Sequence, residues 1–177
     1  MTAMANPHPL EIAPTAVIKR HPRAIPEAPG VYVFLSPRGA DIMRSLRFSA
    51  HQIEHRLKVG GLDALYLGST LNLRARIHSH LGGYRSSNLV STILAAELRF
   101  HIIAGSPAED IGILSQRIRE WLIAETWTGH AVTDEFREAE RKWMRVGKTC
   151  FNITLGSARP GDCRHWCAQH FPHLRLS

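Results

Sequence analysis

An arginine and a histidine at helical spacing are the first residues that could do chemistry. Arg76 and His80 lie four positions apart in a segment with apolar residues at helical intervals, so the two side chains share one helix face. A fixed guanidinium beside an imidazole suits phosphoryl transfer, because arginine offsets negative charge on the phosphate and histidine can exchange a proton with water. Taken alone, an exposed basic face of an ordinary helix is the simpler interpretation.

Glu140 is the next candidate, because it falls between Phe136 and Trp143 on an otherwise apolar helix face. A carboxylate turned toward the interior costs several kcal/mol unless it is paired with a cation or binds a metal. The alternative is a glutamate that pairs with an arginine such as Arg76, or that reaches solvent at the edge of the face. Glu125 ends another apolar stripe in the same way and is a second candidate.

Two tyrosines lie in short β-prone runs that each contain a glycine. Tyr32 closes the run GVY at 30–32 and Tyr66 opens the run YLG at 66–68; each tyrosine alone is typical of a half-buried strand residue. Together with the residues above, their order and spacing resemble the GIY-YIG nuclease family. The resemblance covers about residues 29–156, with these later motif positions: Arg76, His80, Glu140 and Asn152.

The resemblance implies an α+β domain with a small antiparallel three-stranded sheet flanked by helices. It also implies an endonuclease that hydrolyses DNA phosphodiester bonds with a single divalent metal. Glu140 would ligate Mg²⁺ or Mn²⁺, with Glu125 as the alternative ligand. A lone carboxylate suits Mg²⁺, because this ion keeps most of its waters and lets the substrate phosphate complete the octahedron.

The same resemblance assigns roles to the remaining motif positions. Arg76 would stabilise the pentacovalent phosphate, and Tyr66 or Tyr32 would activate or orient water. His80 would assist proton transfer or hold the phosphate. Two supporting positions complete the set: Gly68, and Asn152, which would fix its loop by hydrogen bonds.

The chain departs from the family pattern in two places. Tyr32 and Tyr66 are separated by 33 residues, where the family usually has a short connection, so residues 38–63 are predicted to form a helical insertion. The insertion would either pack on the sheet or contact DNA through basic residues of its own: Arg44, Arg47, Arg56 and Lys58. Two helices, not one, are predicted after the third strand, which keeps both Glu125 and Glu140 as metal candidates; the motif spacing favours Glu140.

Apolar periodicity and Gly/Pro punctuation predict the elements that position these residues. Three strands are predicted at 31–35, 64–68 and 97–104. Helices are predicted within 41–58, after an N-cap at Ser69 or Thr70, after Pro107, and over 134–146. The predicted organisation is a flexible basic arm (1–24), one nuclease domain (25–157) and a tail that contains Cys and His (158–177).

The charge of the 177-residue chain favours a polyanionic partner. It has 22 Lys and Arg against 15 Asp and Glu, a net charge of +7, and no acidic residue between positions 64 and 96. Two basic stretches could line one groove for a DNA phosphate backbone, where each neutralised phosphate releases counterions. Two solvated faces are the alternative. The predicted DNA-binding residues are Arg74, Arg85, Arg141, Lys142 and Arg145.

The tail contains four residues of the metal-ligating types, spaced C-x₃-C-x₂-H-x₂-H: Cys163, Cys167, His170 and His173. Their nitrogen and sulfur donors could close a tetrahedral zinc site, but the short spacing leaves little loop between the ligand pairs. Free thiols and surface histidines are the preferred interpretation, with zinc as the alternative.

The class of protein follows from what the chain lacks. No run approaches the roughly 18 apolar residues of a membrane helix, the first residues do not resemble a signal peptide, and three cysteines are too few for a disulfide framework here. We therefore expect a cytoplasmic protein, associated with DNA or the nucleoid, and no membrane partner. Three alternatives to a self-sufficient nuclease stay open: a noncatalytic nucleic-acid-binding module, a nuclease subunit that needs a homodimer or a protein partner, and a zinc-dependent protein-interaction domain.

Overall fold

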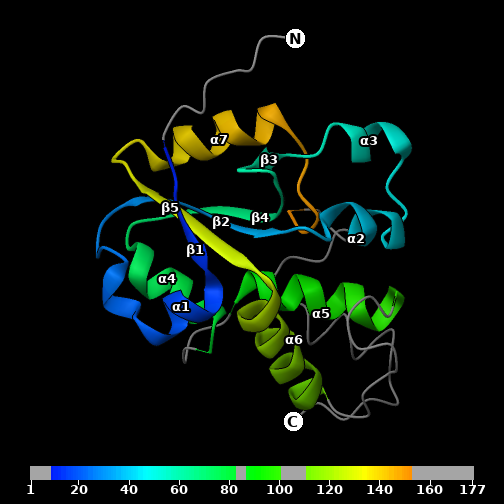
Figure 1. The fold of residues 1–177 in the computed structure, drawn as a ribbon, viewed down its shortest axis with the longest axis horizontal. Coiled ribbons are helices and arrows are strands. Elements are labelled where there is room, and N and C mark those ends of the chain that lie inside the picture. Colours follow the sequence, from blue (N-terminus) through cyan, green and yellow to red (C-terminus); the bar gives the residue numbers. More distant parts are fainter. Residues whose placement is uncertain (1–8, 83–86, 101–110, 153–177) are drawn as a thin grey trace.

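A five-stranded antiparallel sheet forms the centre of the computed structural model, which describes residues 9–82, 87–100 and 111–152 (Figure 1). The strands are β1 (Glu11–Pro14), β2 (Gly30–Ser36), β3 (Lys58–Val59), β4 (Leu62–Thr70) and β5 (Trp127–Val132). Their order across the sheet is β1-β5-β2-β4-β3. Every residue of the middle strand β2 is buried, which accounts for its uninterrupted apolar and aromatic run.

Helices cover both faces of this sheet. One face carries α7 (Phe136–Val146), and the other carries α1 (Thr15–Arg20), α4 (Leu73–His80), α5 (Asn88–Phe100) and α6 (Ile111–Glu125) (Figure 1). Because side chains alternate along a strand, β2 sends Val33 and Leu35 toward Trp143 of α7, and it sends Tyr32 and Phe34 into the larger core on the opposite face. The predicted α+β class is confirmed, but the predicted three-stranded sheet is wrong, because β1 and β3 add an edge strand on each side of β5, β2 and β4.

None of the helices in the described ranges is long and apolar enough to cross a membrane.

The segment between β2 and β4 contains the helices predicted for the insertion. α2 (Gly39–Ser45) and α3 (Ala50–Glu54) follow β2, and a capping box between Ser49 and Gln52 starts α3. The last part of the predicted insertion is not helical, because β3 pairs with the start of β4. Gly60 and Gly61 adopt positive φ angles in the tight connection between these two strands, a conformation that glycine adopts without strain.

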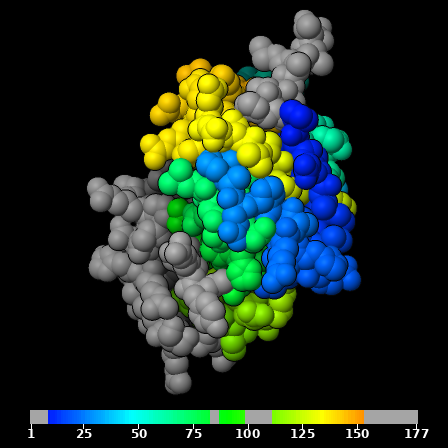
Figure 2. Space-filling model, turned by 90° about the vertical axis from the view of Figure 1, so that its left-hand side faces the viewer, coloured from blue at the N-terminus to red at the C-terminus, as the bar shows by residue number. Residues whose placement is uncertain are grey.

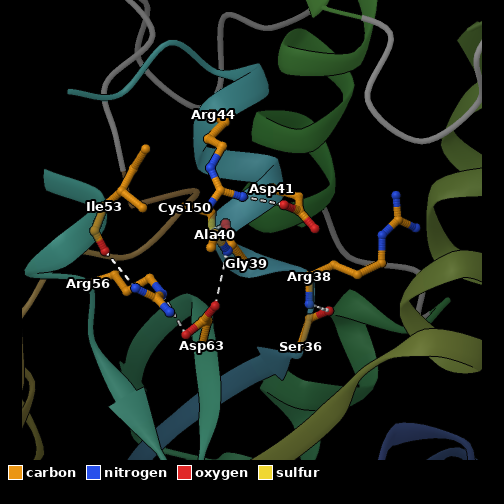
Figure 3. A network of polar contacts seen from close by, with 10 residues as sticks. All are labelled: Ser36, Arg38, Gly39, Ala40, Asp41, Arg44, Ile53, Arg56, Asp63 and Cys150. Carbon is orange, nitrogen blue, oxygen red and sulfur yellow. Dashed lines mark hydrogen bonds and ion pairs between the residues drawn. The ribbon is translucent and has the colours of Figure 1, made fainter. Parts of the chain in front are cut away.

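A buried carboxylate ties the insertion to the sheet (Figure 3). One oxygen of Asp63 accepts the Ala40 backbone N–H at 3.0 Å, and the other accepts Arg56 Nε at 2.7 Å. Arg56 also donates to the Ile53 carbonyl at 2.9 Å. Gly39 packs directly on Asp63, where a Cβ would lie 2.3 Å from the Asp63 Cβ. Arg56 therefore packs the insertion on the sheet, whereas Arg47 and Lys58 of the same segment are exposed.

The third strand of the sheet is β5, not the segment 97–104. Residues 97–100 belong to α5, and 101–104 lie outside the described residues. The prediction was wrong because Leu98 continues a helical stripe with Val90 and Leu94, and all three are buried. The residues around Leu98 also fit the alternation of a strand. A β-prone run of this length does not distinguish the two periodicities.

The N-terminal segment is not a simple arm. Residues 11–24 form β1, α1 and a 3-10 turn (Pro22–Ala24), and β1 pairs with β5 as an edge strand. Buried hydroxyl contacts of Thr15 with Thr126 and Thr128, at 2.8 and 2.9 Å, fix the start of α1 on β5. β1 was missed because an edge strand of four residues receives its stability from the neighbouring strand rather than from its own pattern. Residues 1–8 lie outside the described part of the chain.

Replacing Asp63 with alanine should destabilise the fold by about 3 kcal/mol, because it leaves a partly buried Arg56 guanidinium and the Ala40 N–H without their partner. Urea unfolding followed by circular dichroism measures this loss. The matched control is Asp41→Ala, because Asp41 pairs with Arg44 on the surface, and such a pair contributes less than about 1 kcal/mol. Equal effects of the two substitutions would contradict a structural role for the Asp63 network.

Candidate active site

The two motif glycines lie where strands approach too closely for a side chain. Tyr32 of β2 is directly opposite Gly68 of β4. A Cβ on Gly68 would lie 2.5 Å from the Tyr32 hydroxyl oxygen, and a Cβ on Gly30 would lie 2.2 Å from the Ala131 carbonyl oxygen. Glycine at these positions therefore lets the Tyr32 ring cross over β4 and lets β2 sit against β5.

The turn after β4 starts the helix that carries the arginine and the histidine. Its N-cap is Asn72, whose side chain accepts the Ala75 N–H at 2.9 Å, and not Ser69 or Thr70. Thr70 instead accepts the Asn72 N–H at 3.2 Å within the turn. The prediction was wrong because β4 extends to Thr70 and places the helix start two residues later.

Four of the predicted residues form one polar cluster between β2, β4 and α4. The Tyr32 hydroxyl lies 2.8 Å from His80 Nε2 and accepts Arg76 Nε at 3.3 Å. The ring of Tyr66 lies 5.8 Å from the His80 ring and 6.3 Å from the Tyr32 ring, measured between centroids. His80 continues through Nδ1 to the Ser87 hydroxyl at 2.6 Å.

Ser87 is the member of this cluster that sequence reasoning missed. Its side chain accepts the Val90 N–H at 3.0 Å and so starts α5. A serine followed by an apolar run at helical spacing is a helix-start signal, but the sequence interpretation did not assign a helix to this segment.

Burial sets the protonation of the cluster. His80 is fully buried, and this desolvation, with the charges of Arg76 and Arg119, lowers the pKa of His80 to about 3. Burial likewise raises the pKa of Tyr32 above its ordinary value, and the neighbouring Tyr66 adds to the shift. Burial alone would lower the pKa of Arg76, but the two phenols more than offset this. The cluster is therefore a neutral imidazole, two phenols and a charged guanidinium at neutral pH.

Tyr66 is the phenol that reaches the surface, since it is half-buried while Tyr32 is 1% exposed. Burial raises the pKa of Tyr66, Arg76 opposes this shift, and Glu140 adds to it. The charges of Arg76 and Glu140 thus both act on the Tyr66 hydroxyl. Tyr66 is consequently better placed than Tyr32 to meet a water molecule.

Glu140 approaches the same strand from the opposite face of the sheet. It is half-buried on α7, and one of its carboxylate oxygens accepts the Ser69 hydroxyl of β4 at 2.5 Å. No lysine, arginine or histidine of the described ranges forms an ion pair with it, so the alternative of pairing with Arg76 does not hold there. Figure 2 shows the yellow and orange surface around α7 meeting the green surface of the β4–α4 segment.

The donor set at Glu140 fits a metal that keeps most of its own waters. Within the described residues, no group of three or more His, Cys, Asp or Glu side chains could enclose an ion. A single accessible carboxylate without a cationic partner suits Mg²⁺ or Mn²⁺, which are held by one or two carboxylates together with water and substrate phosphate. It does not suit a closed zinc site, which needs four protein ligands.

Asn152 holds the free edge of β4. Its side-chain oxygen accepts the Leu67 N–H at 2.7 Å, and its side-chain nitrogen donates to the Leu67 carbonyl at 2.6 Å. Thr149 donates to the same amide oxygen at 2.8 Å. The amide thus takes the place of a neighbouring strand at Leu67, between Tyr66 and Gly68, and this fixes the backbone that carries Tyr66.

Glu125 lies apart from these residues. It ends α6 and forms an ion pair with Arg38 at 3.4 Å, with both side chains about half exposed. Within the described residues, no hydrogen bond or ion pair joins Glu125 to Tyr66 or Arg76. Unlike Glu140, Glu125 therefore has a cationic partner within the described residues.

The predicted DNA-binding residues separate into two groups. Arg74 donates to Glu27 at 2.5 Å and to the Ile25 carbonyl at 2.8 Å, so it holds the segment before β2 and is not free. The three predicted residues on α7 are exposed: Arg141, Lys142 and Arg145. At the surface, Arg141 lies 3.7 Å from Glu138. Arg85 lies outside the described residues, and so does the tail with Cys163, Cys167, His170 and His173.

Comparisons of the chain with protein-family models, curated proteins and solved structures found no match.

Lowering the pH should reveal the buried neutral His80. Because the pKa of His80 in the folded chain is about 3, against about 6.5 when unfolded, the unfolded chain takes up the proton first as the pH falls. The stability that this group contributes is therefore complete above about pH 7 and is lost from about pH 6.5 toward 3, at about 1.4 kcal/mol per pH unit.

Urea unfolding between pH 7 and pH 5 tests this sign. The free energy of unfolding of the wild type should fall more steeply than that of His80→Gln. The exposed His78→Gln variant is the matched control and should keep the wild-type slope. Parallel slopes for wild type and His80→Gln would contradict the buried neutral state.

Proposed function

We propose that this protein is a metal-dependent DNA endonuclease of the GIY-YIG type that hydrolyses phosphodiester bonds. The observation that carries the proposal is the meeting of two sets of groups at β4. Tyr66, Arg76 and His80 lie on one side, and the Glu140 carboxylate, without a cationic partner in the described residues, lies on the other. A phosphate bound at the edge of β4 would meet a fixed positive charge and a phenol from one face of the sheet and a potential metal ligand from the other.

Glu140 would hold the metal ion, Mg²⁺ or Mn²⁺. When bound, such an ion stabilises the negative charge that develops on the leaving oxygen. Ser69 would keep the carboxylate oriented, since its hydroxyl donates to one of the two Glu140 oxygens. An oriented ligand loses less conformational freedom when the ion binds.

Arg76 would stabilise the pentacovalent phosphate. Its Nε donates to the Tyr32 hydroxyl. This hydrogen bond fixes the guanidinium and leaves its two outer nitrogens for the phosphate. A guanidinium that does not need to reorganise stabilises developing phosphate charge more effectively than a mobile one.

Tyr66 would act as the general base in this mechanism. Tyr66 would first lose its own proton to solvent; its phenolate would then take a proton from the attacking water while the water oxygen forms a bond to phosphorus and the opposite phosphorus–oxygen bond breaks. The leaving oxygen then receives a proton from solvent. Arg76 favours the phenolate, since its charge lowers the pKa of Tyr66 against the effect of burial.

The DNA backbone would run beside α7. Exposed cations follow Glu140 directly in the sequence, and they lie on the solvent side of a helix whose opposite side packs through Ala139 and Trp143. Contacts of this kind to phosphate set the position of DNA without reading its sequence. They also make binding weaker at higher salt.

Glu140→Gln should abolish cleavage while binding of DNA is kept or strengthened, because the change removes the metal ligand and one negative charge. Supercoiled plasmid and a branched duplex are incubated with wild type and variant in Mg²⁺, Mn²⁺ or EDTA, and nicked and linear products are measured. Glu125→Gln is the matched control and should cut like the wild type.

The other outcomes are informative as well. Undiminished cutting by Glu140→Gln together with loss in Glu125→Gln would move the ligand to α6. Salt-dependent binding without any cutting would favour the noncatalytic module or a nuclease that needs a partner.

Arg76→Ala should lower the cleavage rate by about a hundredfold or more, as loss of a charge that acts in the transition state does. Single-turnover cleavage at saturating protein separates this loss from weaker binding. Arg141→Ala should behave in the opposite way, with weaker binding and a nearly unchanged rate at saturation, because Arg141 is exposed on α7. A purely affinity-based defect in Arg76→Ala would make Arg76 a backbone contact.

A further inference from the structure

Ser87 lies behind the proposed active site and belongs to no motif position. It is 3% exposed and precedes α5. Its hydroxyl oxygen accepts the Val90 N–H at 3.0 Å and lies 2.6 Å from His80 Nδ1. A buried side chain thus joins the start of one helix to the histidine at the end of another.

Counting donors and acceptors assigns the direction of these hydrogen bonds. A backbone N–H only donates, so toward Val90 the Ser87 oxygen is an acceptor. The Ser87 proton needs an acceptor of its own, because a buried hydroxyl without one costs free energy. Among its partners in the described residues, His80 Nδ1 is the one atom that can accept. A neutral imidazole that accepts at Nδ1 carries its proton on Nε2.

The tautomer of His80 decides which hydrogen bonds the Tyr32 hydroxyl accepts. His80 Nε2 then donates to the Tyr32 hydroxyl at 2.8 Å, where Arg76 Nε also donates at 3.3 Å. With both lone pairs of its oxygen occupied, Tyr32 has its own proton free to donate, and Tyr66 is the neighbouring phenol. The rings of the two tyrosines lie 6.3 Å apart, measured between centroids, so Tyr66 is within the direction that the Tyr32 proton can take.

We propose that Ser87 is a positioning residue that holds His80 as the Nε2–H tautomer, so that a chain of donors runs from Ser87 through His80 and Tyr32 toward Tyr66. The inference deepens the nuclease proposal and rests on it for its catalytic meaning. Without the Ser87 hydroxyl, His80 can turn to the other tautomer and accept the proton of Tyr32. Tyr66 would then lose its donor, and its phenolate would form less readily.

The tautomer is read directly by ¹⁵N–¹H NMR of the histidine side chains at pH 7, without DNA or metal. The His80 signal is assigned by its loss in His80→Gln. In the wild type we expect the proton on Nε2. In Ser87→Ala we expect the proton to move to Nδ1 or to distribute over both nitrogens, and in Ser87→Thr, which keeps a hydroxyl, we expect the wild-type pattern.

Cleavage is measured on the same variants. Ser87→Ala should cut about tenfold or more slowly at saturating DNA and metal, a loss typical of removing the partner that orients an active histidine, and Ser87→Thr should restore most of the rate. Ser49→Ala removes a helix-starting serine far from the motif residues in sequence, at α3. It controls for the lost cap and should leave both the His80 signal and the rate unchanged.

Two results would overturn the inference. One is a wild-type His80 that carries its proton on Nδ1, and the other is an unchanged Nε2–H signal in Ser87→Ala. Because neither result depends on DNA cleavage, a wild type that fails to cut would contradict the nuclease proposal and not the hydrogen-bond assignment.

Discussion

The contact between Tyr32 and Gly68 is the constraint on which the site depends. A tyrosine ring lies flat across the neighbouring strand, with its hydroxyl at a distance from Gly68 that excludes any side chain there. Because the ring can lie over Gly68, the hydroxyl of a tyrosine on the central strand β2 extends over β4, where it meets Arg76 and His80. A larger residue at 68 would push the ring away and separate the strand motif from the helix motif.

Burial of polar groups is tolerated in this cluster because each one finds a partner. His80 is fully buried and uses both ring nitrogens, one toward Tyr32 and one toward Ser87. Arg119 of α6 adds contacts to the Ser79 and His80 carbonyls at the end of α4, at 3.2 and 3.1 Å. A satisfied network of this kind is rigid, since moving one member leaves another buried group unpaired. Tyr66 and Arg76 are the members of the cluster that are partly exposed, and they stand on this rigid base.

The second side of the site depends on the edge of β4. β3 pairs only with Leu62 and Asp63; beyond them, backbone hydrogen bonds with residues 57, 150 and 151 occupy the edge at Ala64 and Leu65. Asn152 occupies the edge at Leu67, and Glu140 reaches Ser69 farther along the strand. The Asp63 network holds the insertion against the first part of β4 (Figure 3).

Local sequence determined much of this arrangement. The buried run of β2, the strand around Tyr66, the helical spacing of Arg76 and His80, and the amphipathic helix of Glu140 could all be predicted, because each depends on residue types within a few positions. The order and spacing of the tyrosines, the arginine, the histidine and the glutamate carried the family resemblance, which stays a prediction. Apolar runs near Leu98 were misassigned, because a short run fits a helix and a strand equally well until its neighbours are known.

Tertiary structure decided the rest, since those features depend on residues distant in the chain. β1 exists because β5 offers it an edge, and Arg74 pairs with Glu27 and the Ile25 carbonyl, which hold the segment before β2. Glu125 has a cationic partner and Glu140 has none within the described residues, and Tyr66 is more exposed than the buried Tyr32. Pairing and burial are properties of the packed chain, so no local pattern of residues encodes them.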